Sequence, residues 1–491
     1  MPKLTRFHLL ELATVLLVVT AALWLIPQFG TQHDEVLFAK PAFNSRLSHA
    51  VLMVGKKPLP LMMMSYLGAL KVYVYKLVFG IFPANLWSLR LPALIVLLSA
   101  ALLLRNALRQ LGYTVAGVAF FSLFLVSPSV IITGVFDWGP VCLQFLFFGG
   151  LVYFLARATG GRQLKWFALA GLFFGLGVWE KLTFAMAFTP SALLLFCAAV
   201  WQFPRKKWIT AAAAFLFASL IGMSPFLIAA SLNKEPAASR LQVEKDAFGM
   251  KYATFSHSVA GTVLIGYFTS RDEYIDAIAS PLPTFWARTT ERVLAISDFD
   301  RWILLGLILL TACIPGRTHL MRGLLLTTFA TSWLAMASFH NLGASGHHTV
   351  LLHPLLLMAF ALAVDDAWPV ARWRYVAGSM AALLALINCA SLSDIVMRVK
   401  YLPVPIVWSP AISSAAVAVA KTRPTLVYVD DWGLENSLVL FSKGRIQPFG
   451  TTYWLAEADS FDREWAAKAV TEAGAIFVGF EIGRASCRER V

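Results

Sequence analysis

The sequence is poor in charged residues. Only 14% of its 491 residues are charged, whereas a soluble domain carries roughly 25%. Hydrophobic residues make up 58%, and apolar runs of about 20 residues, long enough to cross a bilayer, recur through the first four hundred positions. The shortage of charge therefore excludes an ordinary soluble enzyme and predicts an α-helical polytopic membrane protein. The first run, residues 9–27, is too long for a signal peptide and lacks a small-residue cleavage site, so we expect it to remain as a span.

Cysteine is also scarce, and its positions exclude a disulfide framework. The chain has five cysteines and no CxxC pair. Four of them fall inside apolar runs, where cysteine packs as a small hydrophobe: Cys142, Cys197, Cys313 and Cys389. No Asn-x-Ser/Thr sequon occurs anywhere in the chain. Cysteine usage therefore says little about the redox compartment, while the missing sequon fits a bacterial inner (plasma) membrane.

The net charge of +14 is not accompanied by a basic soluble domain. Lysine and arginine instead gather in short loops between the apolar runs, which is the distribution typical of cytoplasmic loops. This pattern favours membrane lipids as partners and argues against a nucleic acid. Lys3 and Arg6 precede the first span, so the same rule puts the N-terminus in the cytoplasm.

Threading the chain by this rule predicts about 11 transmembrane helices within residues 1–400. Two outer loops, 28–87 and 232–300, then face the extracytoplasmic side together with the C-terminus. Residues 59–82 are apolar but contain Lys71 and Lys76. We expect this stretch to be helix lying at the membrane interface, because a spanning helix with two unpaired lysines is costly.

The character of the sequence changes after about residue 400. "PTLVYVDD" and "AIFVGF" are typical of short strands, while "WGLENSLVLFSKG" and "SFDREWAAKAVTEAG" are typical of helices that end at glycine. A small extracytoplasmic α/β domain is expected over residues 401–480, cut off before completion. Residues 481–491 resemble a translated sequencing adapter, and we exclude them from fold reasoning.

Several ionisable residues fall on one side of the membrane under this topology. Asp34 and Glu35 follow the first span, Asp137 lies at the tip of the next outer hairpin, and Glu180 and Lys181 occupy another outer turn. Ionisable groups at such edges are candidates for a site that faces the extracytoplasmic leaflet. The plainer alternatives are solvated acids at helix ends and a lysine that reaches lipid headgroups. Seven of the nine histidines also lie in outer segments or at outer helix ends, among them His33, His347 and His348.

The order of these motifs resembles the GT-C membrane glycosyltransferases, in particular the branch of protein O-mannosyltransferases and the aminoarabinose transferase of lipid A. The acidic pair is followed by "KKPLP", which contains Lys57, and then by "LRLPAL" at the start of a span. Asp137 and Lys181 stand where the family has an acid and a lysine turn. The similarity covers about residues 1–365. The chain departs from the family pattern in two places: Leu37 and Phe38 replace an Arg-Tyr pair, and Lys56 replaces an acid.

This resemblance implies transfer of a sugar from a polyprenyl-phosphate carrier to an acceptor at the outer face. It makes Asp34 the candidate general base, because a carboxylate can accept the proton of the attacking hydroxyl. Glu35 is the orienting neighbour or second acid, and Asp137 orders the acceptor or a lysine. Lys57 and Lys181 are the candidates for binding the carrier phosphate, whose developing negative charge a cation stabilises. Glu180 is a further candidate of the same cluster.

Other interpretations remain open at this stage. A divalent metal held by His33, the acids, His347 and His348 is one, although no HxxxH spacing occurs. A transporter or flippase for lipid-linked sugars is another, which predicts ionisable residues deep within the spans or discontinuous helices at the midplane. A ligase of lipid-linked glycans is a third, and it would share the outer-face site. The acceptor could be a lipid, a glycan or a protein. In the transferase interpretation the stretch 59–82 cradles the prenyl chain, and the loop 232–300 with the tail domain selects the acceptor.

Overall fold

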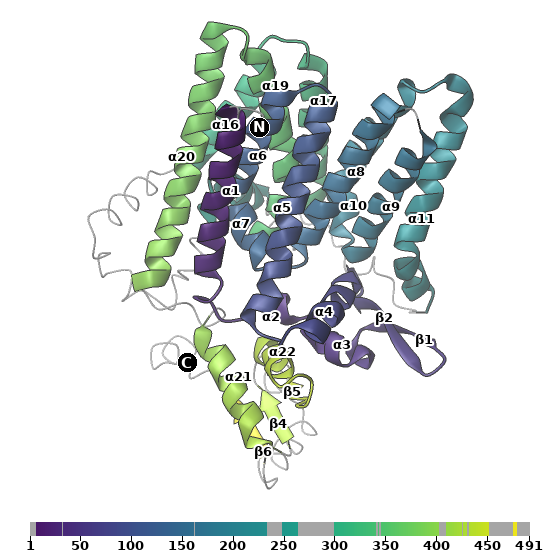
Figure 1. The fold of residues 1–491 in the computed structure, drawn as a ribbon, viewed down its shortest axis with the longest axis vertical. Coiled ribbons are helices and arrows are strands. Elements are labelled where there is room, and N and C mark those ends of the chain that lie inside the picture. Colours follow the sequence, from purple (N-terminus) through teal and green to yellow (C-terminus); the bar gives the residue numbers. More distant parts are fainter. Residues whose placement is uncertain are drawn as a thin grey trace, which may run out of the picture.

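The computed structural model shows a bundle of long helices with a layer of short elements and a small α/β unit at one end (Figure 1). We call this end, which carries residues 26–85, the loop end, and the opposite end the far end. The structure describes residues 6–31, 33–161, 163–232, 248–263, 299–339, 342, 345–401, 409–424, 426–429, 432–450 and 475–478. Most of the predicted outer loop 232–300, the predicted helix at 460–474 and residues 481–491 lie outside this set.

The bundle consists of helices that alternate in direction between the two ends (Figure 1). Its described helices are α1 (Arg6–Leu25), α5 (Leu86–Gln110), α6 (Thr114–Val126), α7 (Pro128–Val135), α8 (Val141–Gly161), α9 (Leu164–Glu180), α10 (Thr183–Trp201), α11 (Trp208–Leu232), α12 (Phe248–Ala260), α16 (Phe299–Cys313), α17 (His319–Ala337), α18 (Gly346–Thr349), α19 (His353–Ala367) and α20 (Ala371–Tyr401). Short 3-10 turns, η2 (Arg205–Lys207) and η4 (Val350–Leu352), precede α11 and α19.

The predicted helical membrane class is confirmed. Among the described residues, 8 helices are long and apolar enough to cross a membrane, or 9 if α6 and α7 form one bent span. That pair bends by 66° at Ser127, where Pro128 has no N–H to continue the helix. The helices α9 and α16 have 17 and 15 residues and fall short of this length. The predicted total of about 11 spans therefore stays a prediction.

Close helix packing is clearest where α9 meets α11. A Cβ on Gly171 would lie 2.1 Å from the carbonyl oxygen of Phe215, and one on Gly175 would lie 2.1 Å from that of Ser219. Glycine at both positions thus lets the two backbones touch, as small residues do in membrane helix pairs. The centre of the bundle is α19, which is almost entirely buried.

The loop end is built from short elements that connect α1 to α5. They are α2 (His33–Val36), α3 (Ala39–Phe43), η1 (Ser45–Leu47), β1 (Ala50–Val54), β2 (Lys57–Met64), β3 (Leu67–Gly68) and α4 (Leu70–Ile81). The three strands form an antiparallel sheet in the order β1-β2-β3, and Val54 pairs with Lys57 at the tip of the first hairpin.

The expected interfacial helix over residues 59–82 is wrong in its first half. Residues 57–64 form strand β2, and helix begins only at Leu70. Pro58 and Pro60 explain the difference, because proline removes a helix hydrogen bond and clashes with the preceding turn. In α4 the side chains of Leu77 and Ile81 are exposed, as expected at an interface. Lys71 departs from the expectation, since it points into the protein and is only 2% exposed.

The C-terminal unit packs against the loop end rather than standing apart. It contains α21 (Pro410–Thr422), β4 (Leu426–Val429), α22 (Trp432–Phe441), β5 (Phe449–Gly450) and β6 (Ala475–Val478), with a parallel sheet in the order β5-β4-β6. Helix α22 lies on α2 and α3. Its Leu440 is buried in one apolar cluster with Val36 and Phe38, and the hydroxyls of Ser437 and Thr31 lie 2.7 Å apart. The described part of the unit therefore supports the segment that follows α1.

Candidate active site

Arg90 anchors the segment that carries the acidic pair. It lies in the second turn of α5 and is fully buried. Two of its N–H groups donate to the carboxylate of Glu35, at 2.6 and 2.8 Å. The other three donate to backbone carbonyls at the end of α1, those of Ile26, Phe29 and Gly30. All five guanidinium donors are thus used, and Glu35 is held by a bidentate salt bridge.

Asp34 is the neighbour of this anchored glutamate, and its carboxylate faces a different environment. It is partly exposed, and the indole N–H of Trp138 donates a hydrogen bond to it. Burial raises the pKa of Asp34 above its ordinary value, although electrostatic interactions with Lys181, His33 and Lys71 oppose this effect. A carboxylate of raised pKa is a stronger base when ionised, so Asp34 has the properties expected of a proton acceptor.

The turn between α7 and α8 brings Asp137 under the same segment. Asp137 and Gly139 both have positive φ, 44° and 69°. The Asp137 carboxylate accepts a hydrogen bond of 3.1 Å from the backbone N–H of Cys142, which caps the start of α8. A Cβ on Gly139 would lie 3.0 Å from Nζ of Lys181 and 3.5 Å from the ring of His347. The absence of a side chain here lets the lysine and the histidine come close to the turn.

Lys71 is the partner of Asp137. Its Nζ lies 2.8 Å from Oδ2 of Asp137, and both side chains are almost completely buried. The same ammonium group lies 4.5 Å from the ring centroid of Phe38 and 5.3 Å from that of Tyr75. Burial lowers the pKa of Lys71, but the Asp137 carboxylate outweighs it and the net shift is upward. Lys71 therefore stays protonated, and its salt bridge with Asp137 joins α4 to the turn before α8.

Lys181 is the second buried cation of the cluster. It follows α9, and its Nζ approaches the carbonyl oxygen of Gly139 at 3.4 Å. The backbone around it is fixed by the sheet of the loop end, because Leu182 N–H donates to the carbonyl of Tyr66. Burial lowers the pKa of Lys181 to about 8, against the opposing effect of the nearby carboxylates. The contact between Nζ of Lys181 and the carbonyl oxygen of Gly139 is longer than a typical N–H···O bond, so the ammonium group is held loosely.

The other residues predicted for the site lie around Asp34, Asp137, Lys71 and Lys181. Glu180, the last residue of α9, is completely buried and interacts with the charges of Asp137 and Lys71. His347 stacks on the ring of Trp138 at 5.2 Å, and His348 lies 4.1 Å from His347. His33 is buried beside Asp34. The structure therefore gathers Asp34, Glu35, Asp137, Glu180, Lys181 and the three histidines at one place.

Lys57 is not brought to this cluster. It is exposed at the tip of the β1–β2 hairpin, which points away from α2 (Figure 1). Its assignment to the carrier phosphate stays a prediction. The metal alternative has no support among the described residues, where no group of three or more His, Cys, Asp or Glu side chains is arranged to hold a metal ion. We therefore derive no step through a metal.

Residues 69–229 match the family model described as dolichyl-phosphate-mannose-protein mannosyltransferase. This stretch includes α4 with Lys71, the α7–α8 turn with Asp137, and Lys181. A search of curated protein sequences finds no match.

The fold is similar to that of a solved structure, ArnT from Cupriavidus metallidurans bound to undecaprenyl phosphate. The TM-score is 0.57 at 13% identity, and the similarity covers 98% of this chain and 94% of the other. The chain has the GT-C glycosyltransferase fold. The Archaeoglobus fulgidus oligosaccharyltransferase in its apo form is also similar, with a TM-score of 0.49 at 14% identity, over 93% of this chain and 68% of that one. So is oligosaccharyltransferase AglB from the same organism, in complex with an inhibitory peptide and a dolichol-phosphate, with a TM-score of 0.49 at 12% identity and coverage of 96% and 69%.

Within this GT-C fold, sequence reasoning missed three residues of the cluster: Lys71, Arg90 as the partner of Glu35, and Trp138. Lys71 carried a signal, because Lys71 and Lys76 are five positions apart and so project about 140° apart around a helix. Both cannot lie at the same interface. Arg90 stands in a motif but its partner, Glu35, is 55 positions away. Trp138 looked like one more aromatic residue of an apolar turn.

Proposed function

We propose that the protein transfers a sugar from a polyprenyl-phosphate-linked donor to an acceptor hydroxyl at the loop end of the bundle. The observation that carries the proposal is the joining of a base and a cation in one buried cluster. Asp34 and Lys181 come from segments 147 positions apart (181 minus 34) and interact electrostatically. A general base and an anion-stabilising cation are the two groups that such a displacement requires.

The reaction is a single displacement at the anomeric carbon. The acceptor oxygen attacks that carbon while its proton moves to the carboxylate of Asp34. A new glycosidic C–O bond forms as the C–O bond to the phosphate breaks. The bonding pair leaves with the phosphate oxygen, and the ammonium group of Lys181 stabilises the negative charge that develops there. A single displacement of this kind inverts the anomeric centre.

The neighbouring ion pairs position these two groups. Glu35 is engaged by Arg90, so in our proposal it orients Asp34 and takes no proton. Asp137 is engaged by Lys71 and by the start of α8, and we propose that it holds the turn on which Trp138 and Gly139 lie. Both pairs are buried away from water. Removing one partner of such a pair would leave an uncompensated charge and lower stability by several kcal/mol.

Two findings support a lipid-linked donor. The ArnT structure, which has the same fold, contains undecaprenyl phosphate. The family described as dolichyl-phosphate-mannose-protein mannosyltransferase matches residues 69–229, which include Lys71 and Lys181. We propose that the prenyl chain lies along the exposed apolar face of α4, next to Leu77 and Ile81. The sugar and the acceptor class are left to the assay below.

We further propose that the protein lies in a bacterial inner membrane with its far end in the cytoplasm. Basic residues that are exposed at the far end support this orientation: Lys165, Arg205, Lys206, Lys207, Arg317, Arg372 and Arg374. The N-terminus then lies in the cytoplasm, and the cluster faces the extracytoplasmic leaflet, where the C-terminal unit also lies.

The proposal is tested with purified protein in proteoliposomes. A panel of labelled polyprenyl-phosphate sugars is supplied, and consumption of each donor is measured with lipid, glycan or peptide acceptors. For the donor that is consumed, Asp34→Asn should lower kcat by about 100-fold or more, the contribution expected of a general base. The anomeric configuration of the product should be inverted relative to the donor.

Asp300→Asn is the matched control, because Asp300 is a buried acid that pairs with His257 and not with the cluster. It should retain activity. Full activity of a folded Asp34→Asn protein would remove Asp34 from the base role. Movement of the intact donor across the bilayer without cleavage would instead identify a transporter or flippase, and transfer of a whole glycan would identify a ligase.

A further inference from the structure

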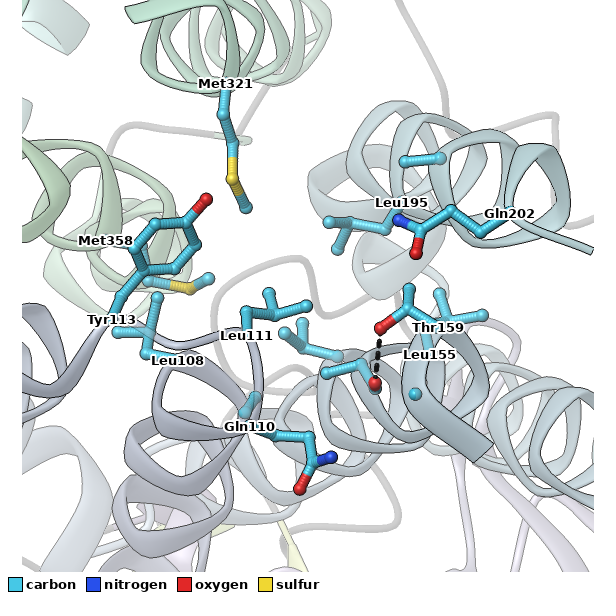
Figure 2. A pocket seen from close by; sticks show the side chains of 15 residues that line it. Leu108, Gln110, Leu111, Tyr113, Leu155, Thr159, Leu195, Gln202, Met321 and Met358 are labelled. Carbon is cyan, nitrogen blue, oxygen red and sulfur yellow. Dashed lines mark hydrogen bonds between the residues drawn. The ribbon is translucent and has the colours of Figure 1, made fainter. Parts of the chain in front are cut away.

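A cavity of about 370 Å³ opens at the far end of the bundle, remote from the charged cluster. It is lined by the far-end parts of α5, α10 and α17, by the second half of α8 and by Met358 near the middle of α19 (Figure 2). The nearest lining residue on α8 is Val152, which lies 11 positions, or about 16 Å, from Val141, where α8 begins after the turn that carries Asp137. The cavity therefore does not belong to the proposed transfer site.

The lining of the cavity is apolar with a few polar groups. Its apolar residues include Leu108, Leu111, Leu195, Ala198, Met321 and Met358. The polar side chains come from Gln110, Tyr113, Thr159 and Gln202, and Figure 2 shows Tyr113 and Gln202 on opposite sides of the opening. Thr159 bonds to its own helix, at the carbonyl of Ala156. Volumes of about 300–1,000 Å³ with this mixture are typical of small-molecule sites.

Positive charge lies next to the opening. Gln202 is followed by η2, in which Arg205, Lys206 and Lys207 are all exposed. On the other side, the guanidinium of Arg317 lies 5.0 Å from the ring centroid of Tyr113, and it also pairs with Asp365. Three exposed cations therefore follow the lining residue Gln202 within five positions along the chain, while the charge of Arg317 is paired.

We propose that the cavity binds one anionic glycerophospholipid, with an acyl chain among the leucines and methionines and the phosphate at η2. The apolar lining suits a hydrocarbon chain, and a hydrophilic ligand would leave that lining uncovered. The cationic segment distinguishes an anionic headgroup from a zwitterionic one, as basic pockets between membrane helices do. Gln202 and Tyr113 then face the glycerol ester region, where their polar groups find acceptors. This inference does not rest on the proposed sugar transfer.

The test compares two lipids with identical acyl chains, phosphatidylglycerol and phosphatidylcholine. Purified, delipidated protein is titrated with each lipid in detergent, and bound lipid is counted by native mass spectrometry and by the shift in Tm. We expect one phosphatidylglycerol to be retained with an affinity at least about tenfold above that of phosphatidylcholine. Inorganic phosphate alone should not shift Tm, because it lacks the chain.

Two variants separate the chain from the headgroup. Ala198→Trp fills the cavity from α10 and should abolish retention of phosphatidylglycerol, while Cys197→Trp, an exposed neighbour outside the lining, should not. Arg205→Gln with Lys206→Gln should lower phosphatidylglycerol affinity about tenfold or more and leave phosphatidylcholine unchanged. Arg372→Gln with Arg374→Gln removes two exposed charges elsewhere at the far end and should have no effect.

Either of two results would overturn the proposal. Equal retention of the two lipids would show that charge does not select the occupant. Undiminished binding in Ala198→Trp would show that the lipid lies elsewhere on the bundle.

Discussion

The two ends of the bundle both bury charged side chains, but they use them differently. At the far end the buried charges hold helix termini. Arg322 donates to the carbonyls of Thr311 and Ile314 at the end of α16, and Asp365 accepts from two backbone N–H groups at the start of α6. At the loop end Asp34 and Lys181 interact electrostatically, and among the described residues the ammonium group of Lys181 makes one long contact, of 3.4 Å, to the carbonyl of Gly139.

This difference indicates which charges are structural. A buried ion that satisfies helix termini completes bonds that the backbone would otherwise lack, so its loss should lower stability. A buried cation with a long, weak contact contributes little to the fold and is available to a substrate. Arg90 is the exception at the loop end, because it caps α1 in the manner of the far-end charges.

The sharpest test of the comparison removes one buried cation at each end. Lys181→Met should lower kcat by about 100- to 1,000-fold, the loss expected when a group that stabilises developing charge is removed. Its stability should change little, because a buried charge is replaced by an apolar chain of similar size. Arg322→Met should do the reverse and lower the free energy of unfolding by about 3–5 kcal/mol. Transfer assays and denaturation of both variants test this comparison. Equal effects of Lys181→Met and Arg322→Met on kcat would contradict the distinction between catalytic and structural charges.

The second test uses pH. Transfer needs Asp34 ionised and Lys181 protonated, so kcat/KM should fall above about pH 8, where Lys181 loses its proton. Lys181→Arg should remove this alkaline limb, because arginine stays protonated. The free energy of unfolding should change with pH in the opposite direction to kcat/KM. Between pH 8 and the ordinary value of 10.5, the unfolded chain binds more protons than the native one, so the contribution of Lys181 to stability rises. An alkaline limb unchanged in Lys181→Arg would contradict the assignment.

The smallest effect is expected where the C-terminal unit touches the loop end. Lys40 on α3 pairs with Glu435 on α22, and both side chains are partly exposed. Such a pair contributes about 0–1 kcal/mol, so Lys40→Glu should lower kcat only a few-fold by loosening the segment after Asp34. Adding Glu435→Lys should restore kcat. A double variant no better than the single one would mean that the pair does not position the segment.

Much of the candidate site could be predicted from the sequence. The apolar runs and the basic loops were sufficient to predict that Asp34, Asp137 and Lys181 share one face, because each follows or precedes a span of known length. The structure has all three at the loop end. The C-terminal strand at 426–429 also lies within the stretch "PTLVYVDD", which is typical of a short strand.

Pairings within that face could not be predicted. Lys71 and Asp137 are 66 positions apart (137 minus 71), and nothing in either segment specifies the other. The same holds for Phe38, which departs from the family pattern. Its ring is fully buried and lies against the ammonium group of Lys71, a contact that only the packing of α4 on the preceding segment creates.

The sequence by itself determined the membrane class, the alternation of spans and the end of the bundle at which the acids meet. Those properties follow from local composition, since hydrophobicity and basic loops act within single segments. Only the tertiary structure showed which of the adjacent acids Asp34 and Glu35 is engaged in a buried salt bridge. Glu35 reaches Arg90 and is neutralised, whereas Asp34 reaches Trp138 and Lys181. The physical reason is that a buried charge is defined by its partners, and those partners lie on helices far away in the chain.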